Sequence, residues 1–141
     1  MGKFAVVYWS GTGNTEAMAN AIVEEIKSLG AEVDLFNATE FNSSLVGNYA
    51  GIAFGCPAMG AEQLEGCEFE PMFLEVKASL AGKNIALFGS YGWGDGEWMR
   101  AWREDCESVG ANVVCEPVIA NDAPDAACFA ELNDLSKALV A

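Results

Sequence analysis

The 141-residue sequence contains no histidine, the side chain that most often serves as general base and as neutral metal ligand. This absence excludes Ser-His-Asp and Cys-His hydrolases in their usual forms. Positive charge is also scarce, with 7 lysines and arginines against 21 aspartates and glutamates and a formal net charge of −14. Nucleic acids and anionic membranes bind basic surfaces, so we expect neither as a partner.

The cysteines lack the spacing of a disulfide framework or a zinc site. They stand at positions 56, 67, 106, 115 and 128, an odd number without a C-x-x-C pair. Reduced thiols in a cytoplasmic protein are the simpler interpretation, and no metal site is predicted. Long hydrophobic runs are missing too. The apolar run 4–9 is short for a signal-peptide core, and polar residues break the uncharged stretch 41–61, so no membrane association is expected.

Short apolar runs alternate along the chain with longer segments of helical periodicity. Five runs are predicted to be strands, at residues 4–9, 33–36, 49–55, 84–89 and 113–119. Apolar residues three or four positions apart predict four helices, the last with Phe129, Leu132, Leu135 and Leu139 on its buried face. No linker or repeat divides the sequence. Residues 1–141 are therefore predicted to form one α/β domain, a three-layer sandwich with helices on both faces of a five-stranded parallel sheet.

The loop after the first predicted strand is rich in neutral hydrogen-bond donors. It reads Ser10-Gly11-Thr12-Gly13-Asn14-Thr15 and leads into a predicted helix, whose first N–H groups and dipole favour an anion. No lysine or arginine lies between Lys3 and Lys27, and both the P-loop motif and the three-glycine dinucleotide motif are missing. A single terminal phosphate suits this loop best, and an ordinary capped turn is the alternative.

The loops after the third and fourth predicted strands contain residues suited to a flat ligand. They read Cys56-Pro57-Ala58-Met59-Gly60-Ala61-Glu62 and Ser90-Tyr91-Gly92-Trp93-Gly94-Asp95-Gly96. In the second loop the glycines allow close approach of the backbone, and Trp93 has only small neighbours, which predicts a planar partner for its ring. A tryptophan folded back on its own loop, or one in a protein contact, is the alternative. Ligands of parallel α/β sheets bind beyond the carboxyl ends of the strands, where these loops are expected.

Together the three loops resemble those of the short-chain flavodoxins, and the resemblance runs from residue 3 to the final helix. Flavodoxins, a type example of the strand order 2-1-3-4-5, bind flavin mononucleotide (FMN) at the switch point of that order, and the resemblance implies both features here. It also implies a low-potential one-electron carrier and not an enzyme, cycling between semiquinone and hydroquinone to shuttle electrons between redox proteins. The residues expected to bind FMN are Trp9, Ser10, Gly11, Thr12, Gly13, Asn14, Thr15, Pro57, Ala58, Met59, Gly60, Ala61, Glu62, Ser90, Tyr91, Gly92, Trp93 and Gly94.

The resemblance also implies roles for individual residues around the flavin. The ring would lie between Met59 and Trp93, and Glu62 would accept a hydrogen bond from the pyrimidine N3–H. The peptide after Gly60 would flip on one-electron reduction, so that its carbonyl accepts a hydrogen bond from flavin N5. Ala61 departs from many short-chain flavodoxins, in which an aspartate is common, and this change removes one negative charge beside the flip.

Four further residues have competing interpretations. Trp9 belongs either to a wall beside the flavin or to the core. Asn121 and Asp122, after the fifth predicted strand, are candidates to contact the ribityl chain. Cys56, at a strand end before a proline, is predicted to pack and not to react.

Acidic residues gather in two stretches near the predicted site. Taken singly, each acid is interpreted as part of a solvated face. Taken together, the acids would disfavour the anionic hydroquinone and steer redox partners with basic docking faces toward a monomeric protein. The two stretches contain Glu62, Glu65, Glu68, Glu70 and Glu75, and Asp95, Glu97, Glu104, Asp105 and Glu107.

Two other functional classes were compared with the electron carrier. A flavoenzyme on the same fold, such as a quinone or nitro reductase, would need a substrate pocket and usually longer loops. A signalling receiver domain of similar topology needs acids after the first and third strands, where Tyr8-Trp9 and Gly55-Cys56 stand instead.

Overall fold

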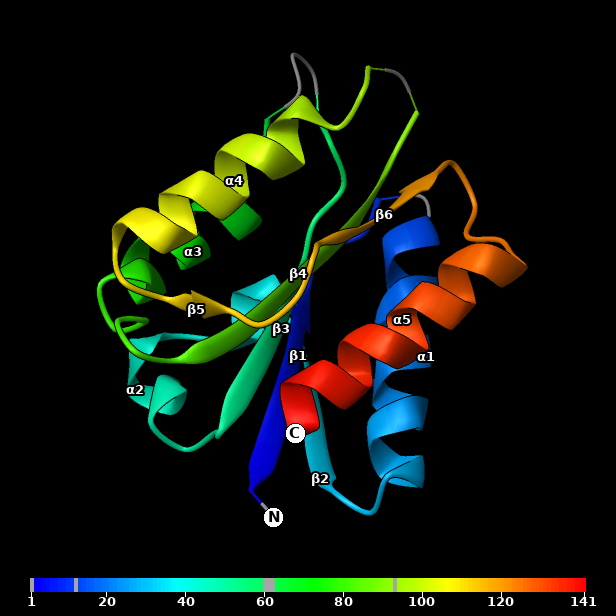
Figure 1. Cartoon of the computed structure of the whole chain (residues 1–141). Coiled ribbons are helices and arrows are strands. Elements are labelled where there is room, and N and C mark those ends of the chain that lie inside the picture. The colour runs from blue at the N-terminus through cyan, green and yellow to red at the C-terminus, as the bar shows by residue number, and fades with distance from the viewer. Residues whose placement is uncertain (1, 12, 60–62, 93) are drawn as a thin grey trace.

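The central element is a parallel sheet whose strand order matches the predicted one. The computed structural model describes residues 2–11, 13–59, 63–92 and 94–141. The strands run in the order β2-β1-β3-β4-β5, and β6 pairs with β4 beyond the end of β5, which confirms the predicted order and fold class (Figure 1). Their bounds are β1 (Lys3–Tyr8), β2 (Glu32–Asn37), β3 (Gly51–Gly55), β4 (Asn84–Tyr91), β5 (Asn112–Val113) and β6 (Val118–Asn121).

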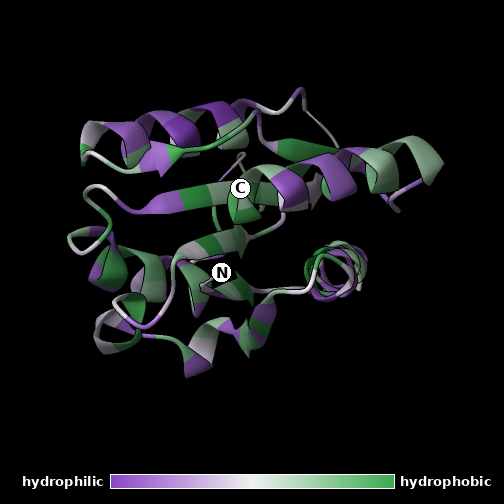
Figure 2. Ribbon diagram, turned by 60° about the horizontal axis from the view of Figure 1, so that its bottom comes forward, coloured by the Kyte–Doolittle hydropathy of each residue, from purple (hydrophilic) through white to green (hydrophobic). Residues whose placement is uncertain are grey.

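Helices cover both faces of the sheet, and each face has its own hydrophobic cluster. One face carries α1 (Asn14–Ser28) and α5 (Ala126–Val140), and the other carries α3 (Phe69–Lys77) and α4 (Glu97–Ser108) (Figure 1). Two short elements lie between β2 and β3, the 3-10 helix η1 (Ala38–Glu40) and α2 (Ser43–Val46). Figure 2 shows hydrophilic and hydrophobic residues interleaved along the helices, as expected where one side packs on a sheet. Within the described ranges, no helix is long and apolar enough to cross a lipid bilayer.

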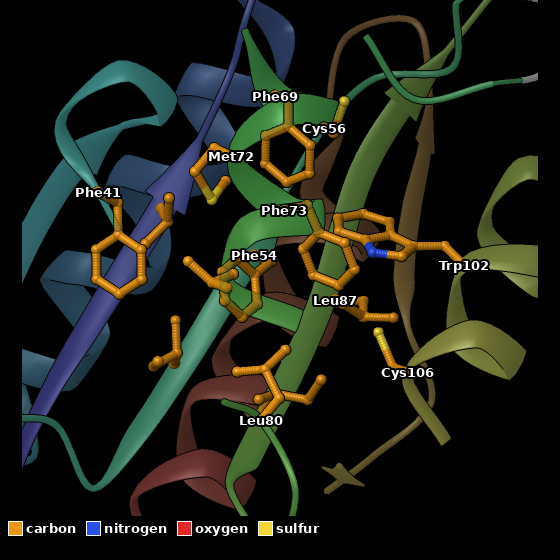
Figure 3. Packing of buried hydrophobic residues seen from close by; sticks show 14 of the residues in the cluster. Phe41, Phe54, Cys56, Phe69, Met72, Phe73, Leu80, Leu87, Trp102 and Cys106 are labelled. Atoms are coloured by element: carbon orange, nitrogen blue, oxygen red, sulfur yellow. The ribbon is translucent and has the colours of Figure 1, made fainter. Parts of the chain in front are cut away.

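Aromatic side chains fix the position of α3 and α4 on the sheet. Phe54 of β3 packs edge-on against Phe73 of α3, with ring centroids 5.4 Å apart. The Trp102 indole of α4 meets the rings of Phe69 and Phe73 at 87° and 84° (Figure 3). Such edge-to-face pairs are favoured over stacked ones because the ring edge is positive and the ring face negative. This packing holds the loops that lead into both helices at one end of the sheet.

The fifth predicted strand, residues 113–119, is interrupted in the structure. Ile85 pairs with Val113 in β5, but the next recorded pair joins Phe88 to Val118 in β6. Because β4 advances from 85 to 88 while its partner advances from 113 to 118, the partner strand bulges out between the two pairs. Pro117 lies in the bulge, where its missing N–H costs no ladder hydrogen bond.

The prediction that Phe129 lies on the buried face of the last helix is wrong. Phe129 is 37% exposed, whereas its neighbour Cys128 is 4% exposed and packs with the leucines of α5. The Asp125 side chain accepts the Cys128 N–H at 2.9 Å and so caps the helix at this point. The buried stripe of α5 therefore starts one residue earlier than the apolar pattern alone predicts.

Candidate functional site

A cavity of about 250 Å³ opens at the carboxyl ends of β1, β3 and β4, where the sequence predicts a ligand. Three loops enclose it, one leading into α1 and the others following β3 and β4. Its lining consists of Trp9, Ser10, Gly11, Asn14, Thr15, Pro57, Ala58, Met59, Ser90, Tyr91, Gly92 and Asp122. All of these except Asp122 belong to the predicted FMN-binding set.

The remaining predicted residues either shape the loops or lie outside the described residues. Gly13 and Gly94 do not line the cavity, and both have positive φ, 97° and 87°. They contribute a backbone conformation that side-chain-bearing residues rarely adopt. Five predicted residues lie outside the described residues, so the roles expected of them stay predictions: Thr12, Gly60, Ala61, Glu62 and Trp93.

Hydroxyl groups form one side of the cavity and retain protons that they can donate. Ser10 Oγ accepts the N–H groups of Gly13, at 3.1 Å, and of Glu16, at 3.2 Å. Thr15 Oγ1 and Ser90 Oγ, both buried, lie 2.8 Å apart and share one hydrogen bond. The Ser10 hydroxyl thus keeps its own proton, and the Thr15–Ser90 pair keeps one of its two. Since no lysine or arginine is among the lining residues, these neutral groups and the start of α1 are the features that suit an anion.

Another part of the lining is apolar and consists of Pro57, Ala58 and Met59 of the loop after β3. Ala58 N–H donates to the Ser90 carbonyl at 2.9 Å, which holds the loop after β3 against the end of β4. Met59 and Gln63 exchange two backbone hydrogen bonds, at 2.8 Å and 2.9 Å, so that the loop between them is closed at its base. The Met59 side chain stays 38% exposed at the rim, as an apolar surface available to a flat ligand.

Among the described residues of the lining, Asp122 is the acidic one, and its backbone is unusual. Its φ is +59°, a left-handed conformation that aspartate tolerates better than most residues. Its N–H donates to the Tyr91 carbonyl at 2.8 Å, which places the carboxylate at the cavity. Asn121, the other candidate after the fifth strand, lines a different cavity. A carboxylate accepts hydrogen bonds from hydroxyls, so this position suits a polyhydroxyl chain better than a phosphate.

Trp9 lies both at the cavity and against the core, and its place beside a flavin stays a prediction. Its half-buried ring lines the cavity and also packs against the hydrophobic cluster beneath α3 and α4. The indole N–H donates to Glu68 Oε1 at 2.7 Å. Trp9 therefore connects the cavity wall to the start of α3.

Cys56 is a packed thiol, as the sequence predicts. Burial raises its pKa to about 12, while the Glu65 N–H that donates to Sγ at 3.3 Å opposes the shift only in part. Its carbonyl accepts the Trp98 indole N–H at 3.3 Å. A thiol with this pKa stays protonated near neutral pH and is a poor nucleophile.

The interpretation of every acid as part of a solvated face is wrong for Glu65. Its side chain is 6% exposed and accepts the N–H groups of Cys67, Glu68 and Phe69 at 2.7–2.9 Å. Glu75 is exposed but accepts the N–H of Ser43 at 2.8 Å, at the start of α2. Together with Glu68, these acids hold specific donors, a role that charge counting along the sequence does not reveal.

Thiol reactivity provides a direct check of this arrangement. We expect the exposed Cys67 to react quickly with a thiol reagent at mildly alkaline pH, and Cys56 and Cys106 to stay unreacted until the protein unfolds, because burial raises the pKa of both to about 12. Mass spectrometry after brief labelling measures the modified positions, and labelling in denaturant is the control. Rapid labelling of Cys56 in the folded protein would contradict its packed role.

The parallel sheet and the donor-lined cavity at its carboxyl edge define an α/β protein of the nucleotide-binding type. The sequence model of the flavodoxin family matches residues 6–133, and the chain belongs to this family. It is 48% identical over 120 residues to a flavodoxin of Megasphaera elsdenii, covering 85% of this chain and 87% of that one. It is 47% identical over 122 residues to a flavodoxin of Clostridium beijerinckii, covering 86% and 88%.

A solved structure supports the same relationship. The solution structure of two-electron reduced Megasphaera elsdenii flavodoxin superimposes with a TM-score of 0.87 at 46% identity, covering 94% of this chain and 97% of that one. As a flavodoxin, the chain is an FMN-binding electron-transfer protein that cycles between semiquinone and hydroquinone. The lining fits this cofactor, since it combines neutral donors suited to a phosphate with apolar side chains suited to a flat ring.

Proposed function

We propose that FMN binds in this cavity with its phosphate at residues 10–15 and Ser90 and its ring at the rim formed by Met59. The observation that carries this placement is the division of the lining into a hydroxyl side and an apolar side. Asp122, which also lines the cavity, would accept hydrogen bonds from the ribityl hydroxyls. The remaining predicted binding residues complete the same two groups of contacts.

We further propose that the protein carries electrons without turning over a substrate of its own. FMN supplies the one-electron chemistry, and this chain binds the cofactor, orients it and leaves one edge near the surface. Exposure of Met59 at the rim supports this, because an electron carrier needs its cofactor edge close to the partner protein. The proposal includes a single domain over residues 1–141, a monomeric state and a cytoplasmic location.

The proposed partners are redox proteins with basic docking faces. The net charge is −14, and Glu68, Glu70 and Asp95, near the loops that enclose the cavity, are exposed. A field of one sign steers oppositely charged partners and raises the rate of encounter. Arg100, also close to these loops, is paired with Asp95 at 3.0 Å, so its charge is compensated locally.

Two kinetic measurements on the FMN-loaded protein test this function. We expect electron transfer to a small basic haem protein to slow by roughly tenfold as ionic strength rises from low to above physiological values, because salt screens the steering field. We expect no steady oxidation of NADH or NADPH by the protein alone. A transfer rate independent of salt would contradict the basic partner, and steady NAD(P)H turnover would indicate a flavoenzyme.

A further inference from the structure

The hydrogen bond between Trp9 and Glu68 joins two segments that are distant in the sequence. Trp9 follows β1 and immediately precedes Ser10, while Glu68 stands just before α3. The indole Nε1 donates to Glu68 Oε1 at 2.7 Å, within the range of a charge-assisted hydrogen bond. Glu68 is exposed and Trp9 is half-buried, so this bond lies on the solvent side of a residue that lines the cavity.

The Trp9 ring lies against the backbone of Gly11. A Cβ built on Gly11 would lie 3.1 Å from Cη2 and 3.2 Å from Cζ3 of the indole, tighter than most real contacts. The six-membered part of the ring therefore covers Gly11, while the opposite edge, which carries the N–H, faces Glu68. The backbone N–H of Trp9 donates to the Gly55 carbonyl at 3.0 Å and fixes the main chain. The rotation of the Trp9 side chain is fixed instead by the hydrogen bond of its indole N–H to Glu68.

Glu68 is itself held in place by the sheet. Its N–H donates to the buried Glu65 carboxylate at 2.7 Å. The Glu65 N–H in turn donates to Cys56 Sγ, at the end of β3, at 3.3 Å. The backbone that carries Glu68 is thus anchored beside the cavity. Because it is already ordered, less conformational entropy is lost when the Glu68 carboxylate accepts the Trp9 indole N–H.

Electrostatics alone would disfavour an acid at this place. A carboxylate near a loop that accepts a phosphate repels the ligand, and no lysine or arginine lies among the residues that line the cavity. If Glu68 affected the ligand only through its charge, a neutral side chain at this position would favour phosphate binding more. Its contact with Trp9 supplies a different reason for its presence.

We propose that Glu68 is a positioning residue for the phosphate loop. By accepting the indole N–H, it holds the Trp9 ring against Gly11 and keeps Ser10 and Gly11 in the conformation that binds the terminal phosphate. The inference rests on the proposed placement of the FMN phosphate. It predicts that the Trp9–Glu68 bond contributes to the affinity for FMN but not for riboflavin, which lacks the phosphate.

The test measures the dissociation constants of FMN and riboflavin for the apoprotein, by quenching of flavin fluorescence. We expect Glu68→Ala and Trp9→Phe each to weaken FMN binding by about tenfold, and the double variant to be no weaker than either one. Glu68→Gln keeps an acceptor for the indole N–H and should stay within about twofold of the unmodified protein. For the two Glu68 variants, riboflavin affinity should change by less than about twofold; Trp9→Phe is compared for FMN alone, because the Trp9 ring itself lines the cavity.

Glu70→Ala is the matched control, because Glu70 is an exposed acid two residues further on whose side chain makes no hydrogen bond or ion pair among the described residues. Urea unfolding of each apoprotein verifies that the variants are folded. Equal FMN affinities of Glu68→Ala and Glu68→Gln, additive losses in the double variant, or parallel losses for riboflavin would each overturn the positioning role. If the unmodified protein bound FMN and riboflavin equally well, the proposed phosphate placement itself would fail.

Discussion

Replacing Gly89 with alanine is expected to lower the free energy of unfolding by about 3 kcal/mol, the upper end of the usual cost of an overpacked core. A Cβ on Gly89 would lie 2.2 Å from the carbonyl oxygen and 3.1 Å from the carbonyl carbon of Cys56. Both are backbone atoms, so no side-chain rotation relieves the overlap. The chain after β3 would have to move away from β4.

That movement would break or weaken two hydrogen bonds of the Cys56 backbone. The Cys56 N–H donates to the Phe88 carbonyl at 3.2 Å, and the Cys56 carbonyl accepts the Trp98 indole at 3.3 Å. Displacing Cys56 would also displace Ala58 and Met59, which line the cavity. The alanine variant should therefore bind FMN more weakly as well as unfold more easily.

Gly47→Ala is the control for this substitution. Gly47 has φ of −68°, and a Cβ there meets no atom within 4 Å. Its free energy of unfolding should change by no more than about 0.5 kcal/mol. Urea unfolding followed by circular dichroism measures both variants. Similar midpoints for the two would show that the approach of Cys56 to Gly89 is not a constraint on the fold.

The sheet and its cavity could largely be predicted from sequence because their signals are local. Apolar runs mark buried strands, and a loop such as residues 10–15 contains its glycines and hydroxyls in one continuous segment. The strand order came from the resemblance to flavodoxins, since apolar runs do not state which strand lies beside which. The sequence offers Asn121 and Asp122 as equivalent candidates, and the left-handed turn that brings Asp122 to the cavity is visible only in the structure.

The errors arose where a contact that the apolar pattern does not contain decides the outcome. The interruption between β5 and β6 depends on the register of two pairs with β4, and the exposure of Phe129 depends on where Asp125 caps the helix. The acids of the 65–75 stretch look alike in the sequence. One of them, Glu65, is buried under backbone donors and another, Glu68, reaches the indole of Trp9.

Glu65→Ala is expected to lower the free energy of unfolding by about 2–3 kcal/mol at neutral pH, because three backbone N–H groups at the start of α3 lose their acceptor. Glu65→Gln should cost less, about 1 kcal/mol. Its amide oxygen can still accept from Glu68 and Phe69, but its NH₂ group would face the N–H of Cys67. Glu70→Gln, at an exposed site in the first turn of α3, is the control and should change the value by about 0.5 kcal/mol.

The pH dependence of the free energy of unfolding distinguishes the contribution of the Glu65 charge from that of its shape and neutral hydrogen bonds. Burial by itself would raise the pKa of this carboxyl, but the backbone donors outweigh it, and the folded-state pKa lies below the ordinary value of about 4.3. A lowered pKa means that the stabilisation is fully present above the ordinary value and is lost as the pH falls through the folded-state value. Protonated Glu65 then resembles glutamine.

The difference in unfolding free energy between the unmodified protein and Glu65→Gln should therefore shrink toward zero on acidification below the ordinary carboxyl range. Chemical denaturation at a series of pH values measures it, and Glu70→Gln gives the background dependence of the other acids. A difference that stays constant across this range would mean that the carboxylate charge does not contribute. In that case the start of α3, and with it the position of Glu68, would be held by neutral hydrogen bonds to the Glu65 side chain and by the packing of Phe69.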